Sequence, residues 1–177
     1  MINLELVLPE IFLSLSIMFL LILGVFKKES SKLIQNISLI VLLITAVITF
    51  NETLGKNETL LFNESIIIDY LSSFMKIITL LAAFLALAMS SNYLRIFKIF
   101  KIEYPILILS SVLGMMVMIS SNDLIVFYMG LELQSLALYV LATFNRDQLK
   151  SSEAGLKYFV LSALSSGLLL YGCSLIY

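Results

Sequence analysis

The sequence predicts an all-α polytopic membrane protein with six transmembrane helices. Two observations support this prediction. Of the 177 residues, 60% are hydrophobic and only 13% are charged, and the mean hydropathy is +1.05, whereas an ordinary soluble domain is about one-quarter charged. The sequence also contains repeated apolar stretches. Their lengths are close to or above the roughly 20 residues needed to cross a hydrocarbon core about 30 Å thick. This composition excludes a water-soluble globule.

The apolar stretches place the predicted helices in a single membrane domain, residues 1–177. Each stretch is continuous and rich in Leu and Ile, whereas strands of a membrane barrel are about ten residues long and alternate in polarity. Met1–Glu5 lacks the features of a cleaved signal peptide, so we expect the first helix to be retained. Pro9 and Pro105 lie near helix starts, where a missing N–H costs little. The predicted helices span about 6–26, 33–50, 66–89, 105–119, 124–144 and 154–177.

Positive charge is confined to alternate connections between the predicted helices. The other connections are nearly free of it; residues 51–65 hold three Glu against Lys56 alone, and residues 120–123 hold no Lys or Arg. The positive-inside rule therefore places the basic loops on the cytoplasmic or matrix side and both termini on the opposite side. The basic residues are Lys27, Lys28 and Lys32, then Arg95, Lys98 and Lys101, then Arg146 and Lys150.

Several classes of function are excluded by what the sequence contains. The formal net charge is −1, so there is no basic excess to attract nucleic acid. The chain has no His and a single Cys, Cys173, so its residues offer no His or multi-Cys metal site, iron–sulfur site or internal disulfide. We also find no nucleophile–base arrangement or phosphate-binding Gly loop. Redox chemistry, if any, is therefore expected in other chains.

Glu132 is the most informative charged residue because it lies near the middle of the fifth predicted helix. At 1.5 Å per residue it is about 18 Å from the basic end of that helix, too far for its carboxylate to reach the interface. Charged residues inside membranes usually face a bundle interior or a water path and mark proton or ion pathways. The alternative is a protonated or amide-paired Glu that only fastens helices together. We favour the proton or ion path.

Lys157 in the sixth helix is the natural partner to consider for Glu132. A rise of 1.5 Å per residue gives a depth difference of roughly 9 Å, which only an inward-extended Lys stem could bridge. The alternative is a helix-surface ion pair with Glu153, in the favourable i,i+4 order, on a helix capped by Ser151 or Ser152. The residues leave both alternatives open.

Asp69 and Lys76 form a second pair of candidates in the third helix. They are seven residues apart, or two helical turns, and therefore project from nearly the same face. They could share a polar seam between helices. Asp69 lies near the outer end and could simply be solvated, whereas Lys76 is deep enough to require a partner.

The loop at residues 51–65 contains three glycosylation patterns, at Asn51, Asn57 and Asn63. The chain is rich in Asn, so chance matches are common. We therefore interpret these residues as a solvated polar loop. In the sixth helix, Ser162 with Ser166 and Ala163 with Gly167 form small-xxx-small pairs, which favour close helix packing.

Three segments of the sequence resemble the antiporter-like membrane subunits of respiratory complex I, and more narrowly the subunit N branch, called subunit 2 in mitochondria. Leu8-Pro9-Glu10-Ile11-Phe12-Leu13 is similar to that family's Leu-Pro-Glu opening. Residues 127–142, FYMGLELQSLALYVLA, resemble its fifth helix with an essential glutamate, and residues 151–159, SSEAGLKYF, resemble the start of its sixth helix. Long ordered matches of this kind are more specific than a short motif.

The resemblance implies roles for the intramembrane charges. Glu132 is expected to be the fifth-helix glutamate of a proton channel and Lys157 the sixth-helix lysine, and Asp69 and Lys76 fall where the family places an Asp and a Lys. The expected partners are the other membrane-arm subunits of complex I, the lipid bilayer and protons. NADH, FMN, iron–sulfur clusters and quinone are expected in other subunits, with no cofactor in this chain. The expected location is a bacterial plasma (inner) or mitochondrial inner membrane.

The family fold has about fourteen helices in two inverted repeats, so six helices correspond to its first part. We expect the sequence to be a fragment that stops before the seventh helix, or the product of a split gene. Two other functions remain open. One is a subunit of a multi-subunit sodium/proton antiporter. This alternative is disfavoured by the Leu-Pro-Glu opening and by the sequence around the glutamate, Glu132-Leu133-Gln134-Ser135-Leu136. The other is a non-catalytic membrane scaffold.

Overall fold

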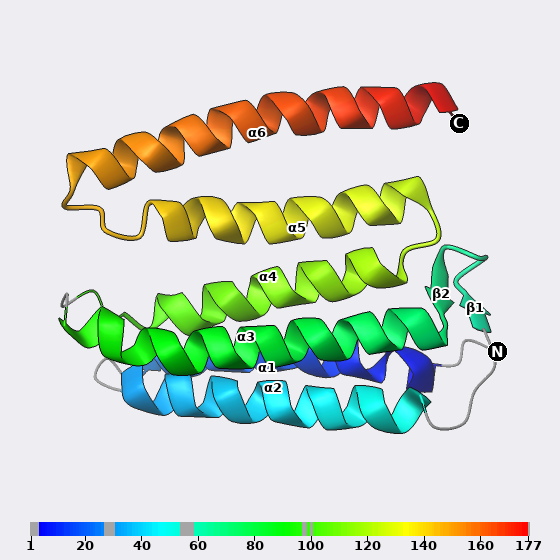
Figure 1. Cartoon of the computed structure of the whole chain (residues 1–177), viewed down its shortest axis with the longest axis horizontal. Helices are drawn as coiled ribbons and strands as arrows, with labels where there is room; N and C mark the ends of the chain where they lie inside the picture. Colours follow the sequence, from blue (N-terminus) through cyan, green and yellow to red (C-terminus); the bar gives the residue numbers. More distant parts are fainter. Residues whose placement is uncertain (1–3, 27–30, 54–58, 97–98, 100, 177) are drawn as a thin grey trace.

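The computed structural model describes residues 4–26, 31–53, 59–96, 99 and 101–176, and over this part the chain is a set of long helices lying side by side (Figure 1). All six α-helices are long and apolar enough to cross a membrane, which confirms the predicted fold class. They are α1 (Leu8–Phe26), α2 (Ser31–Thr53), α3 (Tyr70–Ile96), α4 (Glu103–Ser120), α5 (Leu124–Ala142) and α6 (Leu149–Ile176), with a 3-10 turn η1 (Leu4–Val7) before α1.

The start of the third apolar stretch differs from the prediction. Ile66–Ile68 forms a strand, β2, which pairs antiparallel with β1 (Thr59–Leu61), and the helix begins only at Tyr70. A run of three β-branched Ile residues suits a strand, and Asp69 provides the helix cap that separates strand from helix. The helix then continues to Ile96, beyond the predicted end at Met89. The sixth helix likewise begins earlier than predicted, at Leu149.

Helices α1 to α4 form a four-helix bundle. α1 packs against α2 and α4, and α3 packs against the same two helices, so α1 and α3 lie across the diagonal of the bundle (Figure 1). On each helix the buried side chains recur every three or four residues, which is the period of one helical face. The fully buried apolar residues of this core include Leu13, Leu20, Leu42, Leu80, Leu87, Leu109, Val112 and Met116.

Helix α5 packs onto the outer side of α4 at two glycines. A Cβ on Gly114 would lie 2.6 Å from the backbone N of Gln134, and one on Gly130 would lie 2.8 Å from the backbone N of Met118. Both positions therefore require glycine, because any side chain would collide with the backbone of the other helix. The close approach allows van der Waals packing between backbones, a major source of helix association inside a membrane.

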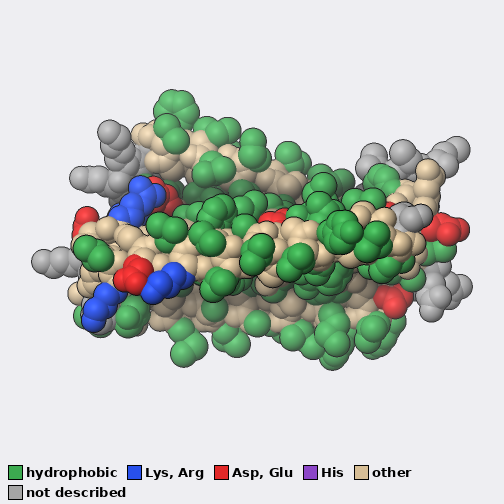
Figure 2. Space-filling model, turned by 90° about the horizontal axis from the view of Figure 1, so that it is seen from above, with side chains coloured by type: hydrophobic (Ala, Val, Ile, Leu, Met, Phe, Trp, Pro, Cys, Tyr) green, Lys and Arg blue, Asp and Glu red, His purple; other side chains and the backbone are tan. Residues whose placement is uncertain are grey.

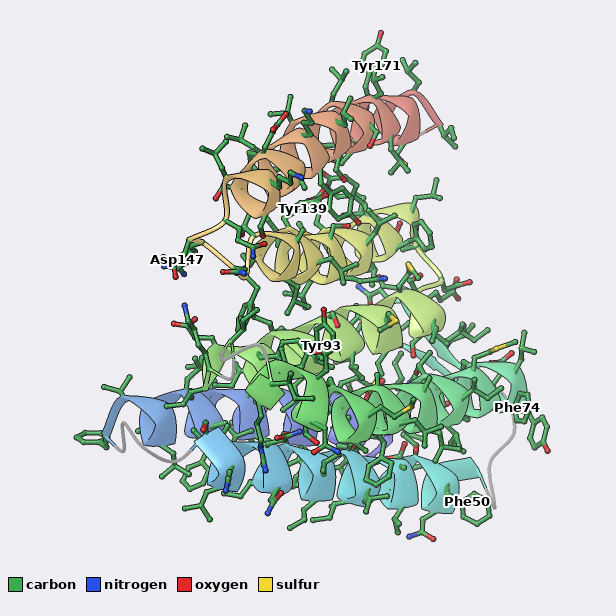
Figure 3. The ribbon with its side chains drawn as sticks, turned by 60° about the vertical axis from the view of Figure 1, so that its left-hand side comes forward. Phe50, Phe74, Tyr93, Tyr139, Asp147 and Tyr171 are labelled. Carbon is green, nitrogen blue, oxygen red and sulfur yellow. The ribbon has the colours of Figure 1, made fainter. Side chains whose placement is uncertain are left out.

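Helix α6 packs against α5 and leaves most of its surface open. Gly155 is its one buried residue, and Figure 3 shows Tyr171 pointing away from the rest of the molecule. The two small-residue pairs predicted in this helix differ in their contacts. Ser162 and Ser166 are half-buried, and Ser162 contacts α5 through Tyr139. By contrast, a Cβ on Gly167 would meet no described atom within 4 Å, so this pair makes no close contact with the described residues.

The two ends of the helix array differ in charge. Lys32, Arg95, Lys101, Arg146 and Lys150 lie at or beside the ends of helices that meet on one side of the array, and Figure 2 shows Lys and Arg atoms gathered at the left-hand end, with hydrophobic side chains covering the visible length. The opposite end carries the β1–β2 hairpin. Asn51 and Asn63 lie at that end and are exposed, while Asn57 lies outside the described residues.

Candidate functional site

Glu132 lies near the middle of α5, as predicted. The helix begins at Leu124 and is capped by Asp123, whose Oδ1 accepts a hydrogen bond of 3.3 Å from the backbone N–H of Ile125. The Glu132 side chain is half-buried. Its Oε1 is buried and has no hydrogen-bond partner among the described residues. A buried carboxyl oxygen of this kind is costly unless a proton, water or a donor group satisfies it.

The face of α5 that carries Glu132 is turned toward α6. Glu132 is two helical turns from Tyr139 and shares its face, whereas Gly130 and Gln134 face α4. The Tyr139 hydroxyl donates a hydrogen bond to Ser162 Oγ. The Tyr139 ring also makes an edge contact with the Tyr158 ring, at 4.8 Å between centroids. The α5–α6 contact therefore places Glu132 beside α6, on the side away from the α1–α4 bundle.

Lys157 does not pair with Glu132. Its Nζ lies 2.5 Å from Glu153 Oε1, and the two side chains are 69% and 55% exposed. Tyr139 and Ser162 lie at the same level of the antiparallel α5–α6 pair. Glu132 is about 10.5 Å from that level and Lys157 about 7.5 Å from it in the opposite direction, so they are separated by about 18 Å along the helices. The sequence-based value of roughly 9 Å was therefore too small.

The start of α6 also differs from the predicted cap. The helix begins at Leu149, and Ser151 lies inside its first turn. The Ser151 hydroxyl donates a hydrogen bond of 2.9 Å to the carbonyl oxygen of Ala142, so it joins α6 to the end of α5. Gly155 permits this close approach, because a Cβ there would overlap the Thr143 side chain at 1.9 Å. The side chain of Ser152 lines a groove instead of capping the helix.

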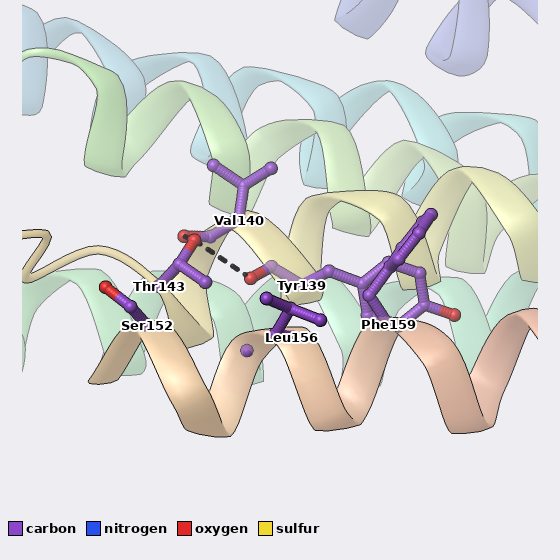
Figure 4. Close-up of a pocket in the computed structure, with 7 residues that line it drawn as sticks. Tyr139, Val140, Thr143, Ser152, Leu156 and Phe159 are labelled. Atoms are coloured by element: carbon purple, nitrogen blue, oxygen red, sulfur yellow. Dashed lines mark hydrogen bonds between the residues drawn. The ribbon is translucent and has the colours of Figure 1, made fainter. Parts of the chain in front are cut away.

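That groove is an apolar depression of about 400 Å³ between α5 and α6, lined by Tyr139, Val140, Thr143, Ser152, Gly155, Leu156 and Phe159 (Figure 4). The Thr143 hydroxyl inside it is already bonded to the backbone of its own helix, 3.3 Å from the Tyr139 carbonyl oxygen. The groove contains none of the charged candidates. It therefore offers no arrangement for acid–base or nucleophilic catalysis.

Lys76 has the partner that its depth requires. Its Nζ lies 2.5 Å from Glu10 Oε1, and the two side chains are 3% and 11% exposed. The ion pair joins α3 to α1 across the diagonal of the bundle. Glu10 was not among the site residues predicted from the sequence. The available signal was an acidic residue inside the first apolar stretch with no nearby basic residue on its own helix to neutralise it.

Asp69 and Lys76 do not form the predicted polar seam. Asp69 instead caps α3: its Oδ1 accepts a hydrogen bond of 2.7 Å from the backbone N–H of Ser72, and its own N–H donates to Ser72 Oγ at 3.0 Å. This reciprocal arrangement satisfies a backbone donor at the helix start, as in a capping box. The role of Asp69 in the structure is therefore local.

We expect Asp69→Ala to lower the free energy of unfolding by about 0.5–2 kcal/mol, the usual loss on removing a cap. Asp69→Asn should retain nearly full stability, because the Asn side-chain oxygen can accept the same hydrogen bond. Thermal unfolding of the full-length protein that carries this segment measures both. A loss of function in Asp69→Asn with unchanged stability would contradict a purely structural role.

Among the described residues, no group of three or more His, Cys, Asp or Glu side chains could hold a metal ion. The titratable groups within the described helices include the unpartnered Oε1 of Glu132 and the Lys76–Glu10 and Lys157–Glu153 ion pairs. Such groups can bind, hold or release protons.

Comparison with known proteins gives consistent results along the whole chain. The chain is 70% identical over 175 residues to NADH-quinone oxidoreductase subunit N of Pelagibacter ubique (strain HTCC1062), covering 99% of this chain and 37% of that protein. The chain resembles NADH-quinone oxidoreductase subunit N. The subunit N proteins of Maricaulis maris and Paramagnetospirillum magneticum are each 51% identical to it, over 99% and 97% of this chain and 36% and 35% of their own lengths.

Two further comparisons concern the fold. The profile of the NADH:quinone oxidoreductase/Mrp antiporter transmembrane family matches residues 121–177, which include α5 and α6. A chain in a structure of respiratory complex I from Thermus thermophilus with bound aureothin superposes with a TM-score of 0.79 at 24% identity, over 96% of this chain and 36% of that chain. The chain thus has the fold of an antiporter-like membrane subunit. It spans just over a third of the length of the subunit N relatives.

Proposed function

We propose that this chain is part of a membrane-arm subunit of NADH:quinone oxidoreductase that moves protons while quinone is reduced elsewhere in the complex. The resemblance to subunit N supports this proposal, as do the six apolar helices and the antiporter-like family profile. The observation that carries most weight is the buried Oε1 of Glu132, which has no hydrogen-bond partner among the described residues. A carboxyl group in that position is suited to accept and release a proton.

In this proposal Glu132 acts as the electrostatic switch. A lysine paired with a carboxylate holds its proton, and when the pair is broken the lysine releases it more readily. Moving one charge against 100 mV requires about 2.3 kcal/mol. The free-energy change on making or breaking one buried ion pair is large enough to contribute to that work. The lysine that would pair with Glu132 is not Lys157 in this conformation, because the two lie about 18 Å apart along the helices.

Lys157 remains a candidate for a later step of the same path. It lies closer to the basic end than Glu132 and already has a carboxylate neighbour, Glu153. We expect Lys157→Gln to lower proton pumping while changing stability by less than about 1 kcal/mol, since exposed ion pairs contribute little. Lys150→Gln, an exposed lysine at the start of the same helix, is the matched control. Equal effects of the two substitutions on pumping would contradict a specific role for Lys157.

The partners, cofactors and location follow from the same proposal. The chain would contact other membrane-arm subunits of complex I, and NADH, FMN, iron–sulfur clusters and quinone would be bound by other subunits. The membrane would be a bacterial plasma membrane or a mitochondrial inner membrane. The basic end of the helix array would face the cytoplasm or matrix, in accordance with the positive-inside rule.

A sodium/proton antiporter subunit is the second candidate, because the family profile that matches residues 121–177 covers both groups. The 70% identity to a subunit N protein favours the oxidoreductase. A non-catalytic scaffold would need the helices but not a buried carboxyl group.

Membrane vesicles containing the complex, with the full-length subunit that carries this segment, can distinguish these candidates. The proposal predicts proton uptake driven by NADH oxidation, independent of sodium and abolished when quinone reduction is inhibited. Sodium/proton exchange that persists without NADH would favour the antiporter. If a complex whose subunit carries this segment pumped normally with both Glu132 and Lys157 neutralised, the scaffold would be favoured.

A further inference from the structure

The inward faces of α1 to α4 change character at the end of the bundle near the β1–β2 hairpin. Along most of the bundle these faces are mainly apolar, and the buried polar side chains among them, Gln35, Ser38, Thr45 and Ser111, donate hydrogen bonds to backbone carbonyls. At this end they carry Glu10 on α1, Thr49 on α2, Lys76 on α3 and Ser120 on α4, all of which are buried except Glu10, which is 11% exposed. We call these four residues the polar layer. Each helix of the bundle contributes one of them.

The register between helices supports this grouping. The Gln35 side chain donates a hydrogen bond of 3.0 Å to the carbonyl oxygen of Leu87, which fixes α2 against α3. Thr49 is about 21 Å beyond Gln35 and Lys76 about 16 Å before Leu87, so they lie at levels within about 5 Å of each other. Their helices run in opposite directions, so both displacements point toward the hairpin end.

The same reasoning places Ser120 in the layer. Thr79 of α3 and Met115 of α4 line one cavity and so lie at a similar level. Lys76 is three residues before Thr79 and Ser120 is five residues after Met115, which leaves an axial difference of about 3 Å. A helical side chain leans toward the N-terminus of its helix, so the Lys76 amine extends further toward the level of Ser120.

Two atoms of the polar layer lack a hydrogen bond. Glu10 Oε1 is held by Lys76, but Glu10 Oε2 is buried and has no partner among the described residues. Ser120 Oγ, on a residue that is 2% exposed, is likewise buried and has no hydrogen-bond partner among the described residues. Other buried hydroxyls of the bundle bond to their own helix, as Thr49 does with the carbonyl of Thr45. An acceptor and a donor are therefore left over at one level of the bundle.

The layer is closed on both sides. Toward the bundle centre, the next residues on the inward faces are the fully buried Leu13, Leu80 and Met116, with Thr45 on α2; the Thr45 hydroxyl already donates to the Leu42 carbonyl of its own helix. Toward the outer end, a separate apolar cluster of Leu6, Leu61 and Ile68 joins η1 and the two strands. Leu6 and Ile68 each lie two residues before the starts of α1 and α3, so this cluster lies at the end of the bundle next to the ion pair. The buried Ser72 also lies on this side, and its hydroxyl donates to the Asp69 carbonyl. Apolar contacts and hydroxyls that are already bonded locally therefore flank the layer, which argues against a continuous proton path through it.

We propose that the polar layer is a closed binding site for internal water, in which water bridges Glu10 Oε2 and Ser120 Oγ and completes the hydrogen bonding of the Glu10–Lys76 ion pair. A buried water needs two to four polar partners, and this site offers the carboxylate, the hydroxyl and the remaining N–H groups of Lys76. The bridge joins α1, α3 and α4. Its role is to hold these helices in register, and it does not depend on the function proposed for Glu132.

Ser120→Ala tests the site, with Ser111→Ala as the matched control. Both serines are on α4 and nearly fully buried, at 2% and 5% exposure, but Ser111 Oγ already donates to the Ile108 carbonyl at 2.8 Å. In the assembled complex we expect Ser120→Ala to lower the Tm measurably, because loss of the bridge leaves the buried Glu10 Oε2 without its water-mediated partner. Ser111→Ala should produce a clearly smaller shift. Equal shifts would overturn the proposal.

A second measurement does not depend on stability. A density map of the complex at a resolution that shows water should contain a peak within hydrogen-bonding distance of Glu10 Oε2 and Ser120 Oγ, and the peak should be absent in Ser120→Ala. Bonding of both atoms to protein groups without water would overturn the proposal. The protons moved per electron by assembled Ser120→Ala complex should be unchanged, and a fall would mean that the layer belongs to the translocation path instead of a closed site.

Discussion

Glu132→Gln is expected to reduce proton pumping by about tenfold or more in membranes that contain normal amounts of assembled complex. Gln has nearly the same shape as Glu but cannot take up or release a proton, so packing beside α6 is preserved while the switch is lost. A proton moved against 100 mV involves about 2.3 kcal/mol, which corresponds to well over a tenfold effect on an equilibrium. The measurement is NADH-driven proton uptake, normalised to the quantity of complex.

The matched control is Glu103→Gln, which makes the same chemical change in the first turn of α4, at the end of the membrane span. It should leave pumping close to the wild-type rate. Glu132→Asp keeps an ionisable group and should retain more activity than Glu132→Gln. Normal pumping by a fully assembled Glu132→Gln complex would contradict the proposed role of Glu132 and leave the fold unaffected.

Gly114→Ala is expected to cause a large structural effect for so small a substitution. The new Cβ would lie 2.6 Å from the backbone N of Gln134 and 2.8 Å from the carbonyl oxygen of Gly130. Backbone atoms cannot rotate away as a flexible side chain can, so α4 and α5 must move apart. Overpacking of this kind costs about 1–3 kcal/mol and sometimes more. The expected result is a marked loss of assembled complex and a lower Tm.

Gly167→Ala is the matched control, because it is the same substitution inside a transmembrane helix with no described atom within 4 Å of the new Cβ. Alanine has the higher helix propensity by about 1 kcal/mol, so this variant should be as stable as the wild type. If Gly114→Ala and Gly167→Ala assembled equally well, the close α4–α5 contact would be wrong.

The fold class and the membrane character were predictable from the sequence because both depend on local composition. About 20 consecutive apolar residues can satisfy their backbone groups in a bilayer only as a helix, whatever lies around them. The depth of Glu132 was predictable for the same reason, since it depends only on position along one helix. The partner of Lys76 was not, because Glu10 is 66 residues away and lies on a helix across the diagonal of the bundle.

Helix boundaries show where local patterns fail. Ile66–Ile68 is as apolar as the helix that follows, yet it pairs with Thr59–Leu61 to form a hairpin, because strand pairing depends on a second segment. Asp69 was considered as part of a polar seam, but its distance from Ser72 makes it a cap. Both corrections come from interactions between segments or across a helix start, which hydropathy does not record.

Hydropathy and helical rise act along a single helix, so the six membrane-spanning helices and the carboxyl group at mid-depth could be predicted from the sequence alone. Which charges meet depends on how the helices pack, and only the structure shows it. It separated Lys157 from Glu132 by the register of α5 and α6, and it brought Glu10 to Lys76 by the packing of α1 and α3 around α2 and α4. Electrostatic interactions weaken with distance and strengthen with burial, so the pairing of these charges depends on how the helices pack as well as on their order in the chain.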